Sequence, residues 1–402
     1  MMFKFLFKLE DPEHLLLGPT LWGLQTWGMW QPIKGKIRII YNTIHLLAII
    51  FVITQYVELW YIRSNLELAL RNLSVTMLST VCVVKASTFI LWQKFWVKIF
   101  EYVSTVEKQQ SILHNAKTKN IIKQYTIYSR RVTYFYWCLV TATVFTVILA
   151  PLALYISSEQ RREQIKNGTA AYPEIMSSWT PFDKTRGVGY WALVIIQCLI
   201  CFYGGGIVAT YDSNAVVLMT FFAGQFEVLR EKCADLFGDG NEFVSYNTAV
   251  KRIRECHMHH ILLVKYAKIF NYLLSPVMFL YVIICSLMIC ASAVQITTEG
   301  TTTMQQVWIA EYLVALVAQL FLYCWHSNEV LYMSLKVDEG VYASAWWSQG
   351  VRIRRLVVLL GGQLNRNVIF TAGPFTNLAV ATFIAILKGS YSYYTLLSQK
   401  ED

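Results

Sequence analysis

Seven long apolar stretches limit what this 402-residue chain can fold into. A helix needs about 20 mostly apolar residues to cross the hydrocarbon core of a bilayer. The stretches are Ile39–Val57, Leu73–Trp92, Val132–Ser158, Gly187–Tyr211, Ile269–Thr298, Val307–Asn328 and Val368–Leu397. A membrane β-barrel would show short alternating segments instead. The sequence therefore predicts an all-α membrane protein with seven transmembrane helices.

The composition agrees with a membrane solvent. Hydrophobic residues make up 55% of the chain and charged residues only 15%, whereas about 25% of a typical soluble domain is charged. This balance excludes an ordinary soluble enzyme or binding domain of this length.

The distribution of basic residues predicts the orientation. Of the 35 Lys and Arg residues, two lie inside spans and only eight lie in segments on one side, namely Arg63, Arg71, Arg161, Arg162, Lys166, Lys184, Arg186 and Lys400. Basic residues are retained on the cytoplasmic side of multi-span proteins, so we expect a cytosolic N-terminus and an extracellular C-terminus. The net charge of +10 then faces anionic membrane lipids, and no nucleic-acid partner is expected.

The two sequons and the nine cysteines allow predictions of glycosylation and disulfide bonding on the extracellular side. Asn167-Gly168-Thr169 lies in the predicted extracellular loop between spans three and four, so we expect glycosylation at Asn167. Asn72-Leu73-Ser74 lies at the outer end of span two, too close to the membrane to be used. No cysteine falls in a predicted extracellular loop, so no disulfide framework is expected.

The chain divides into three regions. Residues 1–38 are predicted to form a cytosolic or interfacial segment, since they hold three tryptophans of the kind that favour the membrane interface. Residues 39–344 contain spans one to six with cytosolic helical extensions at 101–124 and 212–268. Residues 345–402 are predicted to form a broken seventh helix.

Glycine and proline predict where that seventh helix breaks. Gly361-Gly362 and Gly373-Pro374 interrupt it, so we expect a cytosolic anchor helix over about 345–360 and a pore-lining membrane helix over about 375–397. A further run, Gly204-Gly205-Gly206 in span four, indicates close helix packing.

The sequence offers little evidence of a catalytic site. The run Cys256-His257-Met258-His259-His260 offers three imidazoles and a thiol, which are zinc ligands, but no second Cys/His pair with metal-binding spacing follows it. No nucleophile triad, zinc-protease motif or phosphate-binding glycine loop is present. We therefore expect no enzyme activity, no metal and no cofactor.

Lys85 is the exceptional charge within a span. Ionisable groups inside a membrane are costly and mark candidate functional sites. Two interpretations stay open: Lys85 pairs with a carboxylate, for which Glu311 in span six is the candidate, or its side chain extends to the inner membrane surface.

One face of the terminal helix is small and weakly polar. At helical spacing Thr382, Ala385, Gly389, Ser392 and Leu396 share that face. Such faces can line a water-filled path that a hydrophobic ring closes, and equally they can serve helix packing.

The C-terminal third resembles the insect odorant receptor family. The resembling elements run in order over roughly residues 320–397: Tyr323-Cys324-Trp325-His326-Ser327-Asn328-Glu329-Val330, Ser334, Tyr342-Ala343-Ser344-Ala345-Trp346, Ala372-Gly373-Pro374-Phe375, and the run from Thr382 to Leu397. The ending Ser392-Tyr393-Tyr394-Thr395-Leu396-Leu397 is similar to the variable, ligand-recognising type rather than to the coreceptor.

The resemblance implies a tetrameric, odorant-gated, non-selective cation channel in the plasma membrane of olfactory sensory neurons. Such a subunit assembles with a coreceptor subunit into a hetero-tetramer. The last helices would surround one pore for monovalent and divalent cations, with Leu396 and Leu397 matching its outer hydrophobic constriction. The cytosolic ends of spans four to seven would anchor the subunits.

The resemblance also implies a pocket for a small volatile ligand in the outer half of the bundle, walled by spans two, three, four and six. At that depth this chain has Met77, Val81, Phe145, Leu149, Tyr190, Leu193, Gln197, Trp308 and Tyr312. Apolar walls with few polar groups suit such a ligand.

Two other classes compete with this interpretation. A G-protein-coupled receptor also has seven helices, but the topology is reversed and the chain lacks a DRY tripeptide after span three and an NPxxY motif in span seven. A small-molecule transporter should show two similar halves and polar sites at mid-membrane.

Overall fold

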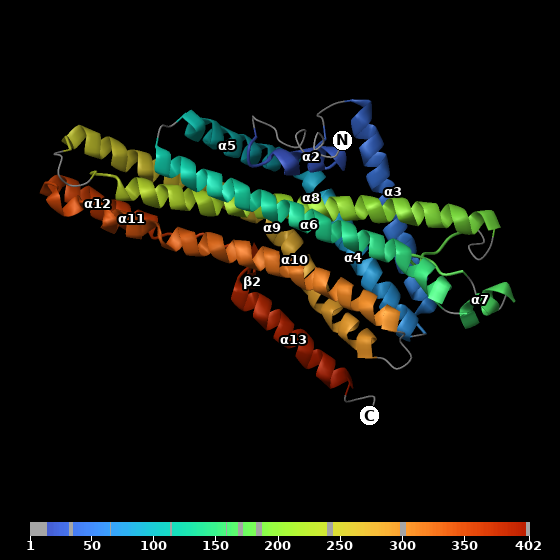
Figure 1. The fold of residues 1–402 in the computed structure, drawn as a ribbon. Helices are drawn as coiled ribbons and strands as arrows, with labels where there is room; N and C mark the ends of the chain where they lie inside the picture. Colours follow the sequence, from blue (N-terminus) through green and yellow to red (C-terminus); the bar gives the residue numbers. More distant parts are fainter. Residues whose placement is uncertain are drawn as a thin grey trace.

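A computed structural model describes residues 14–31, 35–64, 66–112, 115–157, 159–167, 172–181, 187–238, 244–297 and 303–398. Within the described residues the regular secondary structure is helical apart from one short hairpin (Figure 1). The helices are α2 (Gly18–Thr26), α3 (Lys36–Ile62), α4 (Leu66–Leu91), α5 (Gln93–Ile112), α6 (Ala116–Ser157), α7 (Glu159–Lys166), α8 (Gly187–Ala234), α9 (Tyr246–Thr297), α10 (Thr303–Leu335), α11 (Val337–Ala343), α12 (Val351–Leu364) and α13 (Val380–Ser398).

Six of these helices are long and apolar enough to span a membrane, within the described residues: α3, α4, α6, α8, α9 and α10. They match the first six predicted spans. The predicted seventh span corresponds to α13, a 19-residue helix that is not among those six. It carries Lys388 and several hydroxyl side chains.

The longest helices extend well beyond a membrane. Helix α8 has 48 residues and α9 has 52, which at 1.5 Å per residue gives about 70–80 Å against a hydrocarbon core of about 30 Å. They run side by side with α6 and α10, and α11 and α12 lie against their far ends (Figure 1). Helices α8 and α9 thus extend beyond spans four and five into the predicted extension 212–268, whereas residues 101–112 belong to a separate helix, α5. The cytosolic location of these parts stays a prediction.

Small residues let α8 approach its neighbours closely. A Cβ at Gly205 would clash with Val144 of α6, and one at Gly206 would clash with the ring of Trp27. On α2, a Cβ at Gly23 would clash with Thr210. The glycine run thus serves close packing, as predicted, and the N-terminal helix α2 lies directly on α8.

The break before α13 differs from the expected one. Gly361-Gly362 lies inside α12 and does not interrupt it, since a helix tolerates glycine at a cost of about 1 kcal/mol each. The chain leaves helical structure after Leu364 and forms a two-residue hairpin, in which β1 (Thr371–Ala372) pairs antiparallel with β2 (Thr376–Asn377). Phe375 lies in the turn of this hairpin, and the membrane helix begins at Val380.

This hairpin is fixed to α9. The backbone N–H of Gly373 donates to the carbonyl and the hydroxyl of Ser275, at 3.1 and 2.9 Å. The backbone N–H of Thr371 donates to Oδ1 of Asn271 at 2.9 Å. Gly373 has a φ of +68°, a left-handed conformation that glycine adopts without strain.

The structure shows the state of the cysteine side chains. All nine cysteines are described and all are free thiols. The described residues contain no group of three His, Cys, Asp or Glu side chains placed to hold a metal.

The two sequons differ in exposure. Asn72 is buried and accepts a hydrogen bond from Thr76, which leaves that sequon inaccessible. Asn167 is exposed at the end of α7, and its glycosylation stays a prediction.

A carboxyl group on α5 holds the N-terminal segment. The backbone N–H of Leu16 donates to Oε1 of Glu107 at 3.0 Å. Burial raises the pKa of Glu107 to about 7, although the Leu16 N–H and the nearby Arg130 act in the opposite direction. When the segment leaves α5, this carboxyl returns to water and to its ordinary pKa near 4.5. Docking therefore favours the protonated form, and this contribution is lost as the pH rises through about 7.

We expect amide hydrogen exchange in residues 16–24 to be faster at pH 8 than at pH 6 after correction for intrinsic exchange rates. The substitution Glu107→Gln mimics the neutral carboxyl and should abolish this difference, keeping the segment protected at both values. Equal protection of the unmodified protein at pH 6 and pH 8 would contradict the assignment.

Candidate functional site

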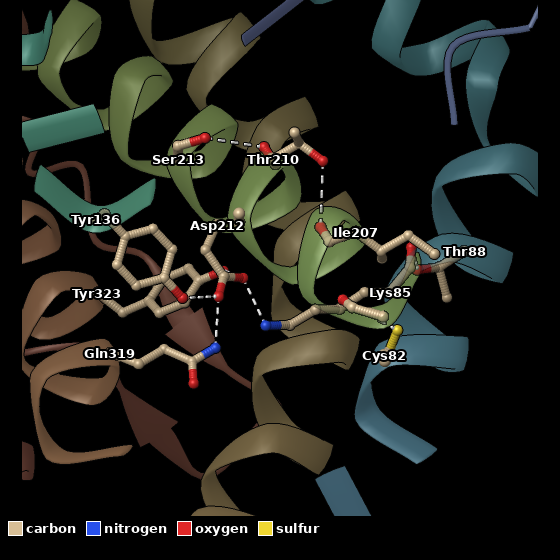
Figure 2. A network of polar contacts seen from close by, with 12 residues as sticks. Cys82, Lys85, Thr88, Tyr136, Ile207, Thr210, Asp212, Ser213, Gln319 and Tyr323 are labelled. Carbon is tan, nitrogen blue, oxygen red and sulfur yellow. Dashed lines mark hydrogen bonds and ion pairs between the residues drawn. The ribbon is translucent and has the colours of Figure 1, made fainter. Parts of the chain in front are cut away.

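Donors from three helices converge on one carboxylate in the middle of the bundle. Asp212 of α8 is 2% exposed. Its Oδ1 accepts from Nζ of Lys85 in α4 and from the hydroxyl of Tyr323 in α10, both at 2.5 Å. Its Oδ2 accepts from the hydroxyl of Tyr136 in α6 at 2.6 Å and from the amide of Gln319 in α10 at 2.5 Å. Figure 2 shows these four side chains pointing toward the carboxylate.

The burial of this group makes its pairing obligatory. Lys85 is 0% exposed, and a charge taken out of water is tolerated only when it is paired and hydrogen-bonded. The ammonium group also lies over the rings of Tyr281 and Tyr323, at 5.1 and 5.9 Å from their centroids, where cation–π attraction adds stabilisation. Through these contacts the Asp212 network ties α4, α6, α8, α9 and α10 together.

Lys85 pairs with a carboxylate, as one of the two interpretations expected, but the expected partner is wrong. Its partner is Asp212 and not Glu311, whose carboxylate instead accepts a hydrogen bond from Thr143 at 2.9 Å. Its side chain does not extend to the inner membrane surface, because it is fully buried. Asp212 was not expected, because span four was predicted to end at Tyr211. A usable signal was present, since the apolar stretch resumes after Asn214 and continues through Ala223.

A cavity of about 140 Å³ adjoins the Asp212 network. We call it the central cavity. It is lined by residues of α3, α4, α6, α8, α10 and the segment 172–181, namely Ala48, Val52, Leu78, Ser79, Cys82, Val83, Tyr136, Leu139, Val140, Thr143, Val144, Val147, Met176, Ile200, Cys201, Tyr203, Gly204, Gly205, Val208, Tyr312, Ala315, Leu316 and Gln319. Tyr136 and Gln319 line this cavity and also donate hydrogen bonds to Asp212.

The lining is suited to a small, mostly apolar molecule. Valine, leucine, isoleucine and alanine side chains form most of the wall, and the hydroxyls of Ser79, Thr143, Tyr203 and Tyr312 are polar groups among them. Binding in such a cavity depends on burial of apolar surface, worth about 25 cal/mol per Å², while a few polar groups set orientation.

The segment 172–181 closes one side of the central cavity. Its residue Met176 lines the cavity, and the side-chain amide of Gln197 in α8 holds it in place. Oε1 of Gln197 accepts from the backbone N–H groups of Ile175 and Met176, at 3.1 and 3.3 Å, and its Nε2 donates to the carbonyl of Met176 at 2.6 Å. Gln55 of α3 donates to the Met176 sulfur at 3.3 Å.

The nine residues expected around the ligand do not form one cluster. Tyr312 alone among them lines the central cavity, and all nine are described. Val81 and Leu193 are buried, Gln197 fixes the segment 172–181, and the hydroxyl of Tyr190 donates to the carbonyl of Pro173. Met77 and Trp308 are half-buried. Phe145 and Leu149 are 49% and 51% exposed on α6. Val81 and Phe145 lie directly beside the lining residues Cys82 and Val144, so they differ from the lining in helix face rather than in depth. The role of the expected residues in binding stays a prediction.

The residues expected to line a pore lie on the outward side of α13. Phe383, Ile386 and Leu387 pack against the hydrophobic core, and α13 lies on α9 and α10. Ala385 and Ser392 are exposed, and the space beside Gly389 is open. Thr382 donates to the carbonyl of Asn377. The side chains of Leu396 and Leu397 lie outside the described residues.

A known family matches most of the chain. The family described as 7tm Odorant receptor matches residues 65–391. Odorant receptor Or2 of Anopheles gambiae is 24% identical over 212 residues, which is 52% of this chain and 56% of that protein. Odorant receptor 82a of Drosophila melanogaster is 23% identical over 368 residues, covering 89% of this chain and 92% of that protein. The match to Or2 thus spans about half of that relative, and the match to 82a nearly all of it.

A solved structure has the same fold. The insect olfactory receptor OR5 of Machilis hrabei, in complex with eugenol, aligns with a TM-score of 0.81 and 17% sequence identity, covering 95% of this chain and 97% of that chain. The same receptor in a structure described without eugenol aligns with a TM-score of 0.79. The arrangement of helices is therefore shared over nearly the whole chain.

The substitution Lys85→Met should destabilise the protein, because it leaves the Asp212 carboxylate buried without its counter-charge. Loss of one partner of a buried pair costs about 3–5 kcal/mol, so we expect a lower thermal unfolding midpoint of the detergent-solubilised protein. The double variant Lys85→Met with Asp212→Asn removes the charge imbalance and should recover part of the loss. The matched control is Lys94→Met, at an exposed position of α5. An unfolding midpoint equal to that of this control would refute the role of the pair.

Proposed function

Because the chain belongs to the 7tm odorant receptor family, we propose that it is the ligand-recognising subunit of an odorant-gated cation channel. In this proposal the central cavity binds a small volatile molecule, and α13 lines the conducting pore. The cavity carries the proposal, since it is an apolar site enclosed by five helices of the bundle. Because the chain belongs to this family, we reject the two competing interpretations, a G-protein-coupled receptor and a small-molecule transporter.

The chemistry of the cavity supports an apolar ligand with few polar atoms. OR5 of Machilis hrabei, which has the same fold, was solved in complex with eugenol, a small aromatic molecule. In this chain the walls are mainly aliphatic, with tyrosine and threonine hydroxyls at intervals. A volatile ligand of this size gains most of its affinity from burial.

The placement of Tyr136 and Gln319 supports a route from ligand to channel. Each lines the central cavity and donates to the Asp212 carboxylate. A ligand that displaces either side chain changes a hydrogen bond to a buried charge, where the low local dielectric makes such a change costly. The proposal is that ligand binding biases the arrangement of α6, α8 and α10 in this way.

The exposure pattern of α13 supports a pore. Its inner side packs on α9 and α10, while Ala385 and Ser392 are exposed and small. In an assembly around a central axis, this face would meet water and cations rather than its own bundle. Leu396 and Leu397 would then form the hydrophobic constriction at the outer mouth.

The far ends of the long helices support assembly. Helix α12 exposes Val351, Val358 and Leu359, although the predicted topology places it in the cytosol. Exposed apolar side chains in water indicate a protein interface. We propose that this region joins the chain to coreceptor subunits in a hetero-tetramer, in the plasma membrane of olfactory sensory neurons.

Co-expression with a coreceptor and application of a volatile panel that includes eugenol tests the ligand site. We expect a ligand-dependent cation current, and the substitution Ala315→Leu should raise the half-maximal ligand concentration at least about tenfold, equivalent to about 1.4 kcal/mol, because it fills the cavity. The control is Val314→Leu, since Val314 is 61% exposed and does not line the cavity. A response that Ala315→Leu leaves unchanged would contradict this site.

Cysteine accessibility tests the pore. A positively charged thiol reagent applied during ligand exposure should reduce the current of the Ala385→Cys variant by more than half. The Ile386→Cys variant should behave as the unmodified protein does, because Ile386 packs against the core. The unmodified protein supplies the background, since its Cys138 is exposed. Modification of both variants or of neither would reject the assigned pore face.

A further inference from the structure

A second cavity, of about 210 Å³, lies between α2 and the pair formed by α6 and α8. We call it the vestibule. It is lined by Trp22, Thr26, Trp27, Trp137, Val140, Thr141, Val144, Phe202, Gly205, Gly206, Ala209 and Thr210. Val140, Val144 and Gly205 also line the central cavity, so a single layer of residues separates the two spaces.

The partition between the two cavities is thin. Gly205 has no side chain, and the methyl groups of Val144 occupy the space that a Cβ there would need. Beside it the ring of Trp27, on the vestibule side, packs edge-on against the ring of Tyr203, on the central side, with 6.5 Å between centroids. The side chains of Val140 and Val144 therefore form the main barrier between the two cavities. Rotation of these side chains opens the barrier, and side-chain rotation is fast.

Hydrogen-bonding groups of the vestibule are largely satisfied within the protein. Nε1 of Trp137 donates to the carbonyl of Ala209 at 3.2 Å and to the hydroxyl of Ser213 at 3.0 Å. The hydroxyls of Thr26 and Thr210 donate to backbone carbonyls of their own helices, at 2.8 and 2.7 Å. The surface offered to an occupant is thus aromatic and aliphatic.

The vestibule opens at the surface of the membrane-spanning part. Thr141 of α6 and Phe202 of α8 are both lining residues and both exposed, and they lie within helices that are apolar enough to span a bilayer. Trp22 and Trp27 come from the N-terminal segment, and tryptophan favours the membrane interface. The mouth of this cavity therefore faces the region that lipid occupies.

We propose that the vestibule binds the apolar ligand on its way from the bilayer and passes it to the central cavity across Val140 and Val144. The inference rests on the proposed function, since it concerns the same ligand. An apolar volatile compound concentrates in the hydrocarbon of the membrane, and the walls shared with the central cavity identify that compound, rather than a lipid chain, as the occupant.

An entry path changes rates and leaves the binding equilibrium intact. The substitution Thr141→Trp narrows the mouth of the vestibule at a position outside the central cavity. With the panel compound of lowest half-maximal concentration applied in rapid pulses, we expect onset and decay of the current to slow at least threefold by the same factor. The half-maximal concentration should stay within twofold of the unmodified value. The matched control is Ala142→Trp, at the next residue, which is exposed and lines neither cavity.

A second variant tests the opposite direction. Phe202→Ala widens the mouth, so onset and decay should both become faster, and this measurement decides the matter if Thr141→Trp fails to reach the cell surface. Unchanged rates in the variants that reach the surface would overturn the proposal. So would a changed half-maximal concentration or maximal current without a change in rates, which indicates a lipid chain or another resident molecule.

A failure of the proposed function is distinguishable from a failure of the vestibule. If the unmodified protein gives no current with any panel compound, the proposed channel is rejected. The same variants in lipid nanodiscs, mixed rapidly with eugenol and followed by quenching of tryptophan fluorescence, then test the path without a current. Equal quenching rates in Thr141→Trp, Ala142→Trp and the unmodified protein would overturn the vestibule on its own.

Discussion

The ion pair between Lys85 and Asp212 is the contact on which the rest of the bundle depends. Two charges inside a membrane protein are tolerable only together, and here each is placed by a different helix. Tyrosines from three further helices, α6, α9 and α10, contact the carboxylate or the ammonium group. The spans cannot shift independently without disturbing this group, which makes it both a structural centre and a sensitive point next to the central cavity.

Much of the fold could be predicted from the sequence because membrane insertion leaves a strong signal. The apolar stretches located the first six spans, and the mixed apolar and charged segments beside them predicted further helical structure, which α5, α8 and α9 contain. The end of the chain was harder. Gly361-Gly362 was expected to break a helix, but α12 continues through both glycines. The break lies further along the chain, at the hairpin that Gly373 turns and that hydrogen bonds from Asn271 and Ser275 hold.

The candidate site was less predictable than the fold. Hydropathy identified Lys85 as unusual but gave no information about which carboxylate would face it across the bundle. Glu311, the acidic residue within the predicted spans, was the wrong choice. Depth along a helix was also too coarse to select lining residues. Tyr312 was found, whereas Ala315, Leu316 and Gln319, one turn or two further along α10, were not, because which face of a helix borders a cavity depends on packing angles that no periodicity encodes.

The hairpin before α13 has a mechanical consequence. Gly373 is bonded to Ser275, and Ser275 directly precedes Pro276, the proline inside α9. A proline removes one backbone hydrogen bond and allows a helix to bend at that point. The hairpin is therefore hydrogen-bonded to α9 directly beside its proline. A bend of α9 at this proline would pull on the chain segment that leads into α13.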